Sequence, residues 1–175
     1  MTATRTQDLA GWFAGRVPDD WFLEAPEVTS DRDEVLVVGR LAEPEYPKDA
    51  DDAARAAARA ARIQRFREDT RDRRMKIADE TEERTGRKTA WGAQCGDERR
   101  VFTSLAVPVM TRLRMSERQV LDTLVGAGVA RSRADALAWC VRLVRDHQGD
   151  WIQQLRDALV AVEDARADGP SPSNA

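Results

Sequence analysis

The sequence predicts an α+β protein, and three features of the 175-residue chain lead to this fold class. The apolar, β-branched run Val35–Val38 follows the turn-forming residues Ser30–Asp33, which is typical of a β-hairpin between about Glu27 and Leu41. A run with helical spacing extends from Ala50 to Thr85 and stops at a glycine, which favours one long helix. The last third of the chain repeats apolar residues at helical spacing and predicts three more helices.

Two further elements complete the N-terminal part. Leu9, Trp12 and Phe13 fall on one side of a short helix near the start of the chain. Downstream of the long helix, the alternating segments Lys88–Cys95 and Arg99–Val107 flank the sequence Gly-Asp-Glu and predict a second hairpin. The apolar stripe of the long helix is sparse, so we expect this helix to pack along one narrow seam.

Five tryptophans are many for a chain of this length. Trp12, Trp21 and Trp91 belong to a residue type that stacks on the bases of single-stranded nucleic acids. Tryptophan more often fills a core or an interface, and this second interpretation is favoured here.

Positive charge is concentrated in the middle of the chain, although the whole carries a net charge of −3. Residues 1–47 hold four arginines against ten acids, whereas residues 48–106 and 107–147 each carry a net charge of +3. Within this basic part, Arg55–Lys76 has eight arginines and one lysine against three acids. This segment is interpreted either as a track for a nucleic-acid backbone or as a solvated helix face with i,i+4 ion pairs. The acids that follow it favour the second interpretation.

The final helices have clear boundaries. They are expected at about Ser116–Ala127, Ser132–His147 and Asp150–Ala167, with the two serines as N-caps. Asp135 follows Ser132 at the spacing of a capping box. The first two of these helices have apolar faces, formed by Val120, Leu121, Leu124 and Val125 in one and by Leu137, Cys140, Val141 and Val144 in the other.

The segment Val109–Met115 has the alternation of a half-buried β-strand. One face consists of Val109, Thr111, Leu113 and Met115, and the opposite face of Met110, Arg112 and Arg114. The first face is suited to burial, while the second presents two guanidinium groups to the surroundings.

A basic strand followed by these two helices resembles the ribbon-helix-helix family of bacterial DNA-binding regulators. The likeness is strongest from Leu121 to Arg142, in the sequence LDTLVGAGVARSRADALAWCVR. The resemblance implies a homodimer in which two chains pair their strands antiparallel and interlock four helices into one core. It also implies that the resulting two-stranded ribbon enters the major groove of double-stranded DNA.

The resemblance assigns six candidate DNA-binding residues, namely Met110, Arg112, Arg114, Arg131, Ser132 and Arg133. The first three would face the bases, and arginine is suited to O6 and N7 of guanine. The last three would hold a backbone phosphate at the start of the second helix, through free N–H groups and positive charge.

Two departures from the family pattern leave an alternative open. The strand lies past residue 100 and begins at Pro108, a position where a strand tolerates proline. The preceding hairpin also offers this strand a partner within its own chain. In that alternative the strand extends an intramolecular sheet, the protein is a monomer and no DNA-binding ribbon exists.

Motifs for catalysis or cofactor binding are not apparent in the sequence. It has no phosphate-binding glycine loop, no nucleophile–histidine–acid set and, with two cysteines and one histidine, no metal-ligand spacing. The sequence therefore predicts a protein that is not an enzyme and needs no cofactor. Without a signal peptide or an apolar run of about 18 residues, it is expected in the cytoplasm at the nucleoid and not in a membrane.

These patterns predict four parts: an α+β region at 1–106, a ribbon-helix-helix-like module at 107–147, a C-terminal helix at 148–167 and a disordered tail at 168–175. The predicted function is that of a dimeric transcriptional regulator or nucleoid-associated protein, with a protein partner as one role for the N-terminal region. The alternative is a dimeric interaction or structural protein that uses the same helices for assembly alone.

Overall fold

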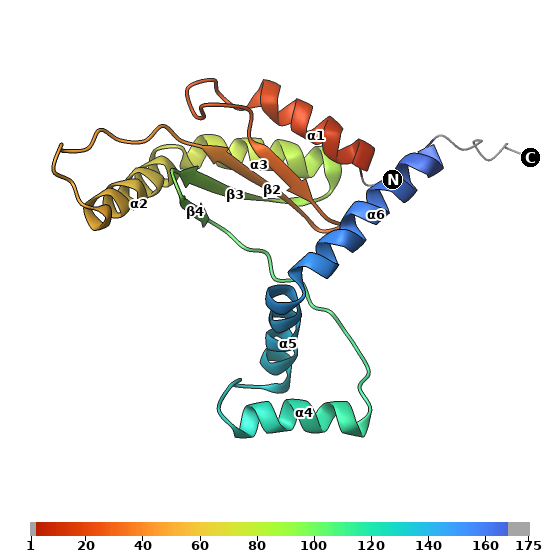
Figure 1. The fold of residues 1–175 in the computed structure, drawn as a ribbon. Coiled ribbons are helices and arrows are strands. Elements are labelled where there is room, and N and C mark those ends of the chain that lie inside the picture. The colour runs from red at the N-terminus through yellow and green to blue at the C-terminus, as the bar shows by residue number, and fades with distance from the viewer. Residues whose placement is uncertain (1–2, 168–175) are drawn as a thin grey trace, which may run out of the picture. The chain divides into compact units, whose positions relative to one another are not determined.

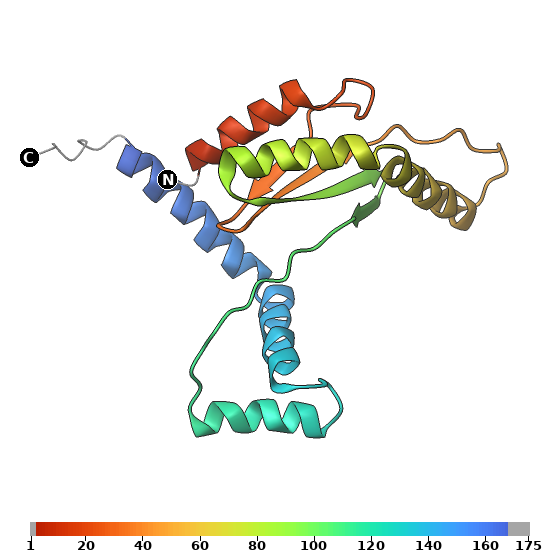
Figure 2. The ribbon, with the colours of Figure 1, turned by 180° about the vertical axis from the view of Figure 1, so that it is seen from behind.

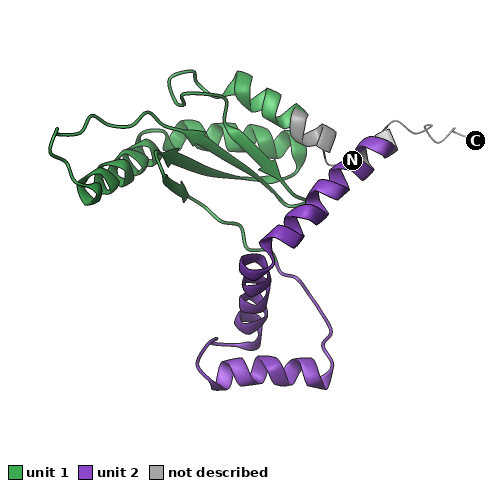
Figure 3. Cartoon of the chain, viewed as in Figure 1, with its two compact units in different colours: residues 1–107 green, residues 108–175 purple. Residues whose placement is uncertain are grey.

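A computed structural model describes residues 3–167 and confirms the α+β class, with six helices and a four-stranded sheet in that range. The chain divides into two compact units, Met1–Val107 (unit 1) and Pro108–Ala175 (unit 2), which Figure 3 colours separately. The sheet belongs to unit 1, and the elements described in unit 2 are helices. The tail expected at residues 168–175 lies outside the described residues.

Both expected hairpins are present, and they join in one sheet (Figure 1). β1 (Glu27–Ser30) pairs antiparallel with β2 (Glu34–Arg40), and β3 (Lys88–Cys95) pairs antiparallel with β4 (Glu98–Val101). The sequence did not predict that β2 and β3 pair in parallel, which gives the strand order β1-β2-β3-β4. The expectation that the last strand reaches Val107 was wrong, since β4 ends six residues earlier.

Three helices contribute to the core on one face of this sheet. α1 (Ala3–Arg16) precedes the first hairpin, and α2 (Asp52–Asp69) and α3 (Arg71–Thr85) connect the two hairpins. Figure 2 shows α3 lying across the sheet from the side opposite to the view of Figure 1. A parallel strand pair requires such a crossover to return the chain to the same end of the sheet. Gly86 ends α3 in the left-handed conformation (φ 70°), as expected from its position.

The expected single helix is interrupted at Thr70, which ends α2 and precedes α3 with φ −100° and ψ 2°. The Thr70 hydroxyl donates to the carbonyl of Phe66 at 2.6 Å, a contact that bends helices. Nη2 of Arg74 donates to the carbonyl of Arg67 at 2.6 Å. That carbonyl is the acceptor that the N–H of Arg71 uses in a continuous helix, so the arginine side chain stabilises the break.

The core of unit 1 is rich in aromatic side chains. Trp21 and Trp91 are 5% and 3% exposed, and their rings meet edge to face with centroids 6.0 Å apart. Phe66 packs edge-on against Trp21, and Phe13 packs in the same way against Trp91. Trp21 and Trp91 therefore fill the core, which is the interpretation that the sequence favoured.

Unit 2 contains α4 (Met115–Gly126), α5 (Arg133–His147) and α6 (Gly149–Ala167), which agree closely with the three expected helices. Its buried residues among those described are Leu121, Ala130 and Ala136. The half-buried apolar residues around them are Leu113, Leu124, Val125, Leu137 and Cys140. Residues of α4, of α5 and of the segment before α4 thus share one small core.

Gly39 of β2 offers a test of how closely the chain before β1 packs on the sheet. A methyl group at Gly39 would overlap the ring of Phe22, whereas one at Gly11, in α1, would meet no atom within 4 Å. We expect Gly39→Ala to lower the free energy of unfolding by about 1–3 kcal/mol through overpacking. Gly11→Ala is the matched control and should raise it by about 0.5–1 kcal/mol through helix propensity. Urea denaturation measures both, and an unchanged midpoint for Gly39→Ala would contradict this packing.

Candidate nucleic-acid interface

The segment expected to form the DNA-binding strand has no regular structure and no paired strand. Residues 103–114 follow β4 as an open trace that leads to α4 (Figure 1). Val109 and Met110 are 85% and 97% exposed. The strand expected at Val109–Met115 is therefore not formed within one chain, because no strand of the described sheet lies beside it to take its backbone hydrogen bonds. The alternative in which this segment extends the sheet of unit 1 was wrong for the same reason.

Arg114, expected in the strand, is the N-cap of α4. Its backbone is extended (φ −76°, ψ 171°), and its N–H donates to Oε2 of Glu117 at 2.5 Å. Ser116, the expected N-cap, lies in the first turn instead. Nη1 of Arg118 donates to the carbonyl of Leu113 at 2.6 Å. These two contacts fix the last residues of the unpaired segment against the first turn of the helix.

Main-chain hydrogen bonds close the turn between α4 and α5. Gly128 adopts φ 74°, and its N–H donates to the carbonyl of Val125 at 3.0 Å. The N–H of Val129 donates to the carbonyl of Leu124, also at 3.0 Å. This pair of bonds is a Schellman motif, which needs a left-handed residue that glycine provides without strain. The motif ends α4 and directs the chain toward α5.

Ser132 is the N-cap of α5, as predicted. Its Oγ accepts the N–H of Asp135 at 3.2 Å, and Oδ2 of Asp135 accepts the N–H of Arg131 at 3.0 Å. This backbone hydrogen bond holds the pKa of Asp135 below its usual value. The start of α5, where a phosphate was expected, thus already carries a carboxylate.

Arg133 is engaged within unit 2 by Asp122 of α4. Its Nε lies 2.6 Å from Oδ1 and its Nη2 2.7 Å from Oδ2, a bidentate ion pair between α4 and α5. The hydrogen bonds raise the pKa of Arg133 and lower that of Asp122. Sequence reasoning missed Asp122 because its partner lies in the next helix. Arg133 therefore joins the two helices in a single chain.

The six candidate residues lie in three places, one of which is the N-cap position of α4 that Arg114 occupies. Arg131, Ser132 and Arg133 lie together at the start of α5, where each makes a hydrogen bond within unit 2. Met110 and Arg112 lie exposed on the unpaired segment, and neither makes a hydrogen bond or ion pair with any residue that the structure describes.

Unit 2 exposes large apolar side chains on all three helices. They are Met115 and Val120 on α4, Val141, Leu143 and Val144 on α5, and Trp151, Leu155, Leu159, Val160 and Val162 on α6. A groove of about 470 Å³ is lined by residues of α5 and α6, among them Cys140, Val144 and Ile152. Exposed apolar patches of this kind mark interaction surfaces. The sequence predicted the apolar face of α5 as buried. Within one chain Leu137 and Cys140 of this face are half-buried, whereas Val141 and Val144 are exposed.

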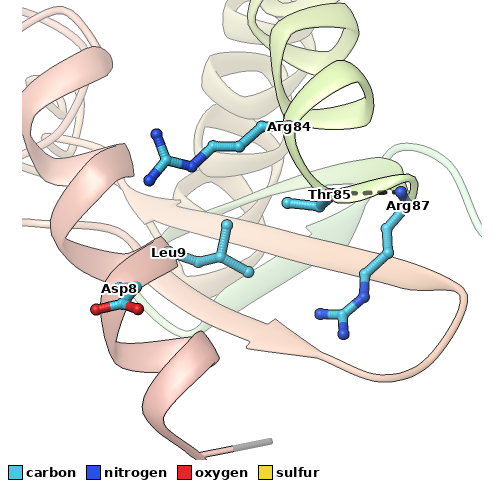
Figure 4. Close-up of a pocket in the computed structure, with 5 residues that line it drawn as sticks. All are labelled: Asp8, Leu9, Arg84, Thr85 and Arg87. Atoms are coloured by element: carbon cyan, nitrogen blue, oxygen red, sulfur yellow. Dashed lines mark hydrogen bonds between the residues drawn. The ribbon is translucent and has the colours of Figure 1, made fainter. Parts of the chain in front are cut away.

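A small pocket of unit 1 is shown in Figure 4, lined by Asp8 and Leu9 of α1 and by Arg84, Thr85 and Arg87. Its volume of about 160 Å³ is below the range of about 300–1,000 Å³ that is typical of ligand sites. Among the described residues, no group of three or more His, Cys, Asp or Glu side chains is placed to hold a metal ion. None of the described helices is long and apolar enough to cross a membrane.

Comparisons with known proteins match both units. Residues 7–101 match the family described as Rv1265-like protein, N-terminal domain, and residues 114–166 match the Mb1296 C-terminal domain. The uncharacterized proteins Mb1296 of Mycobacterium bovis and Rv1265 of Mycobacterium tuberculosis are each 56% identical over 161 residues, which cover 92% of this chain and 70% of the relative. No solved structure matches the chain. Neither family match is described as ribbon-helix-helix.

The two serines at the helix starts test the geometry of this region. Ser132 caps α5 through its side chain, whereas Ser116 lies in the first turn of α4 without capping it. We expect Ser132→Ala to lower the stability of α5 by about 0.5–2 kcal/mol, and Ser116→Ala to change stability by less than about 0.5 kcal/mol. Hydrogen exchange of amides in the two helices measures both. Equal effects of the two substitutions would contradict the assignment of the cap.

Proposed function

The chain belongs to the Rv1265-like family, and we propose that it is a homodimeric protein that binds double-stranded DNA through residues 109–115 and the two helices that follow. The single observation that carries this proposal is an exposed segment with the alternation of a strand in its sequence and no strand partner among the residues that the structure describes. In the dimer the segments of two copies pair antiparallel, and the ribbon enters the major groove. The protein then acts as a transcriptional regulator or nucleoid-associated protein in the cytoplasm.

Backbone hydrogen bonding supports the pairing of two copies. An isolated strand leaves its N–H and C=O groups without protein partners and is unstable in water. A second copy supplies these partners by symmetry, since the same segment is present in each chain. Pro108 precedes the segment, where its lack of an N–H costs no ladder bond.

The orientation of Leu113 supports the assignment of the two faces. Leu113 packs against the cluster of Leu121, Ala130 and Ala136, so its side of the segment faces the helices. Because side chains alternate along a strand, Arg112 then points to the opposite side, away from the helices. This is the orientation that a DNA-reading arginine needs.

The runner-up function is that of a dimeric interaction protein without DNA binding. The exposed apolar side chains of α5 and α6 support assembly in either case. The observation that favours DNA is the charge on the segment, where Arg112 and Arg114 form no ion pair with any described carboxylate. Arg133, by contrast, is neutralised by Asp122 and supports assembly of the helices.

Replacement of Arg112 and Arg114 tests the contact with DNA. We expect Arg112→Ala with Arg114→Ala to weaken DNA binding at least about tenfold, because each guanidinium loses a base contact worth about 1–3 kcal/mol. Light scattering should show an intact dimer. Gel shifts over a range of salt concentrations measure the affinity.

The matched control for this experiment removes the same charge from unit 1. Arg32→Ala with Arg100→Ala changes two exposed arginines that lie outside the segment. If this variant loses DNA binding to the same extent, the interaction depends on overall charge and not on the ribbon. If the wild type does not bind DNA at low salt, the proposed function is wrong.

Proline substitutions test whether the segment pairs between copies. Adjacent N–H groups of a strand point to opposite edges, so one of Thr111→Pro and Arg112→Pro must remove a hydrogen bond of the interchain ladder. We expect at least one of the two to convert the dimer to a monomer in analytical ultracentrifugation, with the helix content unchanged. Ser104→Pro, in the same irregular stretch but outside the ribbon, should leave the dimer intact. Dimers in all three variants would contradict strand pairing.

A further inference from the structure

Unit 1 contains a polar pocket at the junction of α2 and α3 that the proposed function does not use. Its volume of about 400 Å³ lies within the range of about 300–1,000 Å³ typical of small-molecule sites. Its charged lining residues are Asp20, from the chain after α1, and Arg62, Arg65, Asp69 and Arg73 from the two helices. The helical residues fall at i, i+3, i+7 and i+11, so they continue along one side of the crossover past the break.

The pocket holds more positive than negative charge. Arg65 is neutralised by Asp69, with Nε 3.3 Å from Oδ2. Arg62 and Arg73 have no carboxylate within ion-pair distance in the part of the chain that the structure describes. Asp20 is the remaining acid and forms no ion pair there either. Two unpaired guanidinium groups therefore face one unpaired carboxylate.

Of the two unpaired arginines, Arg73 is held by an aromatic contact and Arg62 is partly buried before any ligand binds. The guanidinium of Arg73 lies over the ring of Trp21, 5.8 Å from its centroid, in a cation–π contact. Trp21 is itself held edge to face by Phe66 and Trp91 in the core. Arg62 is half-buried, so it has lost part of its hydration. A ligand that binds both groups therefore does not have to order the side chain of Arg73.

Other arginines add to the positive potential at this bend. Burial and the neighbouring charges of Arg67 and Arg71 lower the pKa of Arg74 to about 10. Arg74 is satisfied by the Thr70 hydroxyl and the Arg67 carbonyl and not by an acid. In the described residues Arg65 pairs with Asp69 and Arg71 pairs with Asp72, which leaves Arg67 and Arg74 as further arginines without an acidic partner.

We propose that the pocket binds a phosphoryl group through Arg62 and Arg73. Guanidinium groups donate paired hydrogen bonds to phosphate oxygens, and a phosphate dianion supplies the counter-charge that the two side chains lack. The phosphoryl group comes either from a free phosphorylated small molecule or from a nucleic-acid backbone. The concave shape of the pocket favours the small molecule. Asp20 opposes the anion and limits its affinity.

Titration of the full chain with inorganic pyrophosphate at low salt tests this proposal, by calorimetry and by NMR shifts of the Trp21 indole. We expect saturable binding by the wild type and at least a tenfold loss for Arg62→Gln with Arg73→Gln. The matched control is Arg67→Gln with Arg71→Gln, which removes the same charge from the same two helices outside the pocket lining. This control should change the affinity less than threefold.

Asp20→Asn should strengthen the binding of pyrophosphate, because it removes the opposing carboxylate. This single variant keeps the test decisive if the double variant fails to fold.

Two outcomes overturn the proposal: no saturable binding of pyrophosphate, or an equal loss of affinity in both double variants, which would indicate diffuse charge. A DNA duplex is the second probe and identifies the source of the phosphoryl group. If Arg62→Gln with Arg73→Gln also weakens DNA binding and pyrophosphate competes with DNA, the group belongs to nucleic acid. If DNA binding is unchanged, the group belongs to a small molecule. The variant lacking Arg112 and Arg114 should still bind pyrophosphate, so this proposal and the proposed function fail separately.

Discussion

The parallel ladder between β2 and β3 is the constraint on which unit 1 depends. Parallel neighbours cannot be joined by a tight turn, so the chain between the two hairpins must cross one face of the sheet. α2 and α3 make this crossing and bury Ile63, Phe66 and Ile77 against the sheet. The sides of the same helices remain in solvent and carry the arginines. The basic pocket at the helix break is thus a consequence of strand topology as well as of composition.

Unit 2 depends on contacts of a different kind. Its turns and caps are complete within one chain, as the bonds around Gly128 and Ser132 and the Asp122–Arg133 pair show. The burial of its apolar side chains is incomplete, because most large apolar residues of α5 and α6 are exposed. Local hydrogen bonds therefore define where the helices of this unit begin and end. Helices in water are usually stabilised by burial of their apolar faces, and that burial requires a second apolar surface to cover α5 and α6.

The sequence predicted the features that depend on residues only a few positions apart in the chain. Gly86 and Ser132 act as expected because a left-handed cap and a serine cap depend on their own neighbours. The break at Thr70 was missed because it depends on a hydrogen bond from the Arg74 side chain to the carbonyl of Arg67. The parallel pairing was missed because apolar and polar residues alternate in the same way in parallel and antiparallel strands. At the candidate site, the sequence predicted that Ser132 caps α5 but not that Arg133 forms an ion pair with Asp122. The pattern at residues 109–115 describes the two faces of a strand. The strand itself needs a partner, and none of the strands described in a single chain lies beside it.

The irregular stretch at residues 103–114 also bears on how long the chain survives in a cell. Proteases bind substrates as extended backbone, and exposed segments without regular hydrogen bonding are their preferred sites of cleavage. Arg112 offers a basic cleavage position near the end of this stretch, in unit 2 and before the capped first turn of α4. Under the proposed pairing the same backbone is held in a ladder and is protected. Degradation would then remove unassembled chains first, so that the surviving population is enriched in dimers whatever the rate of synthesis.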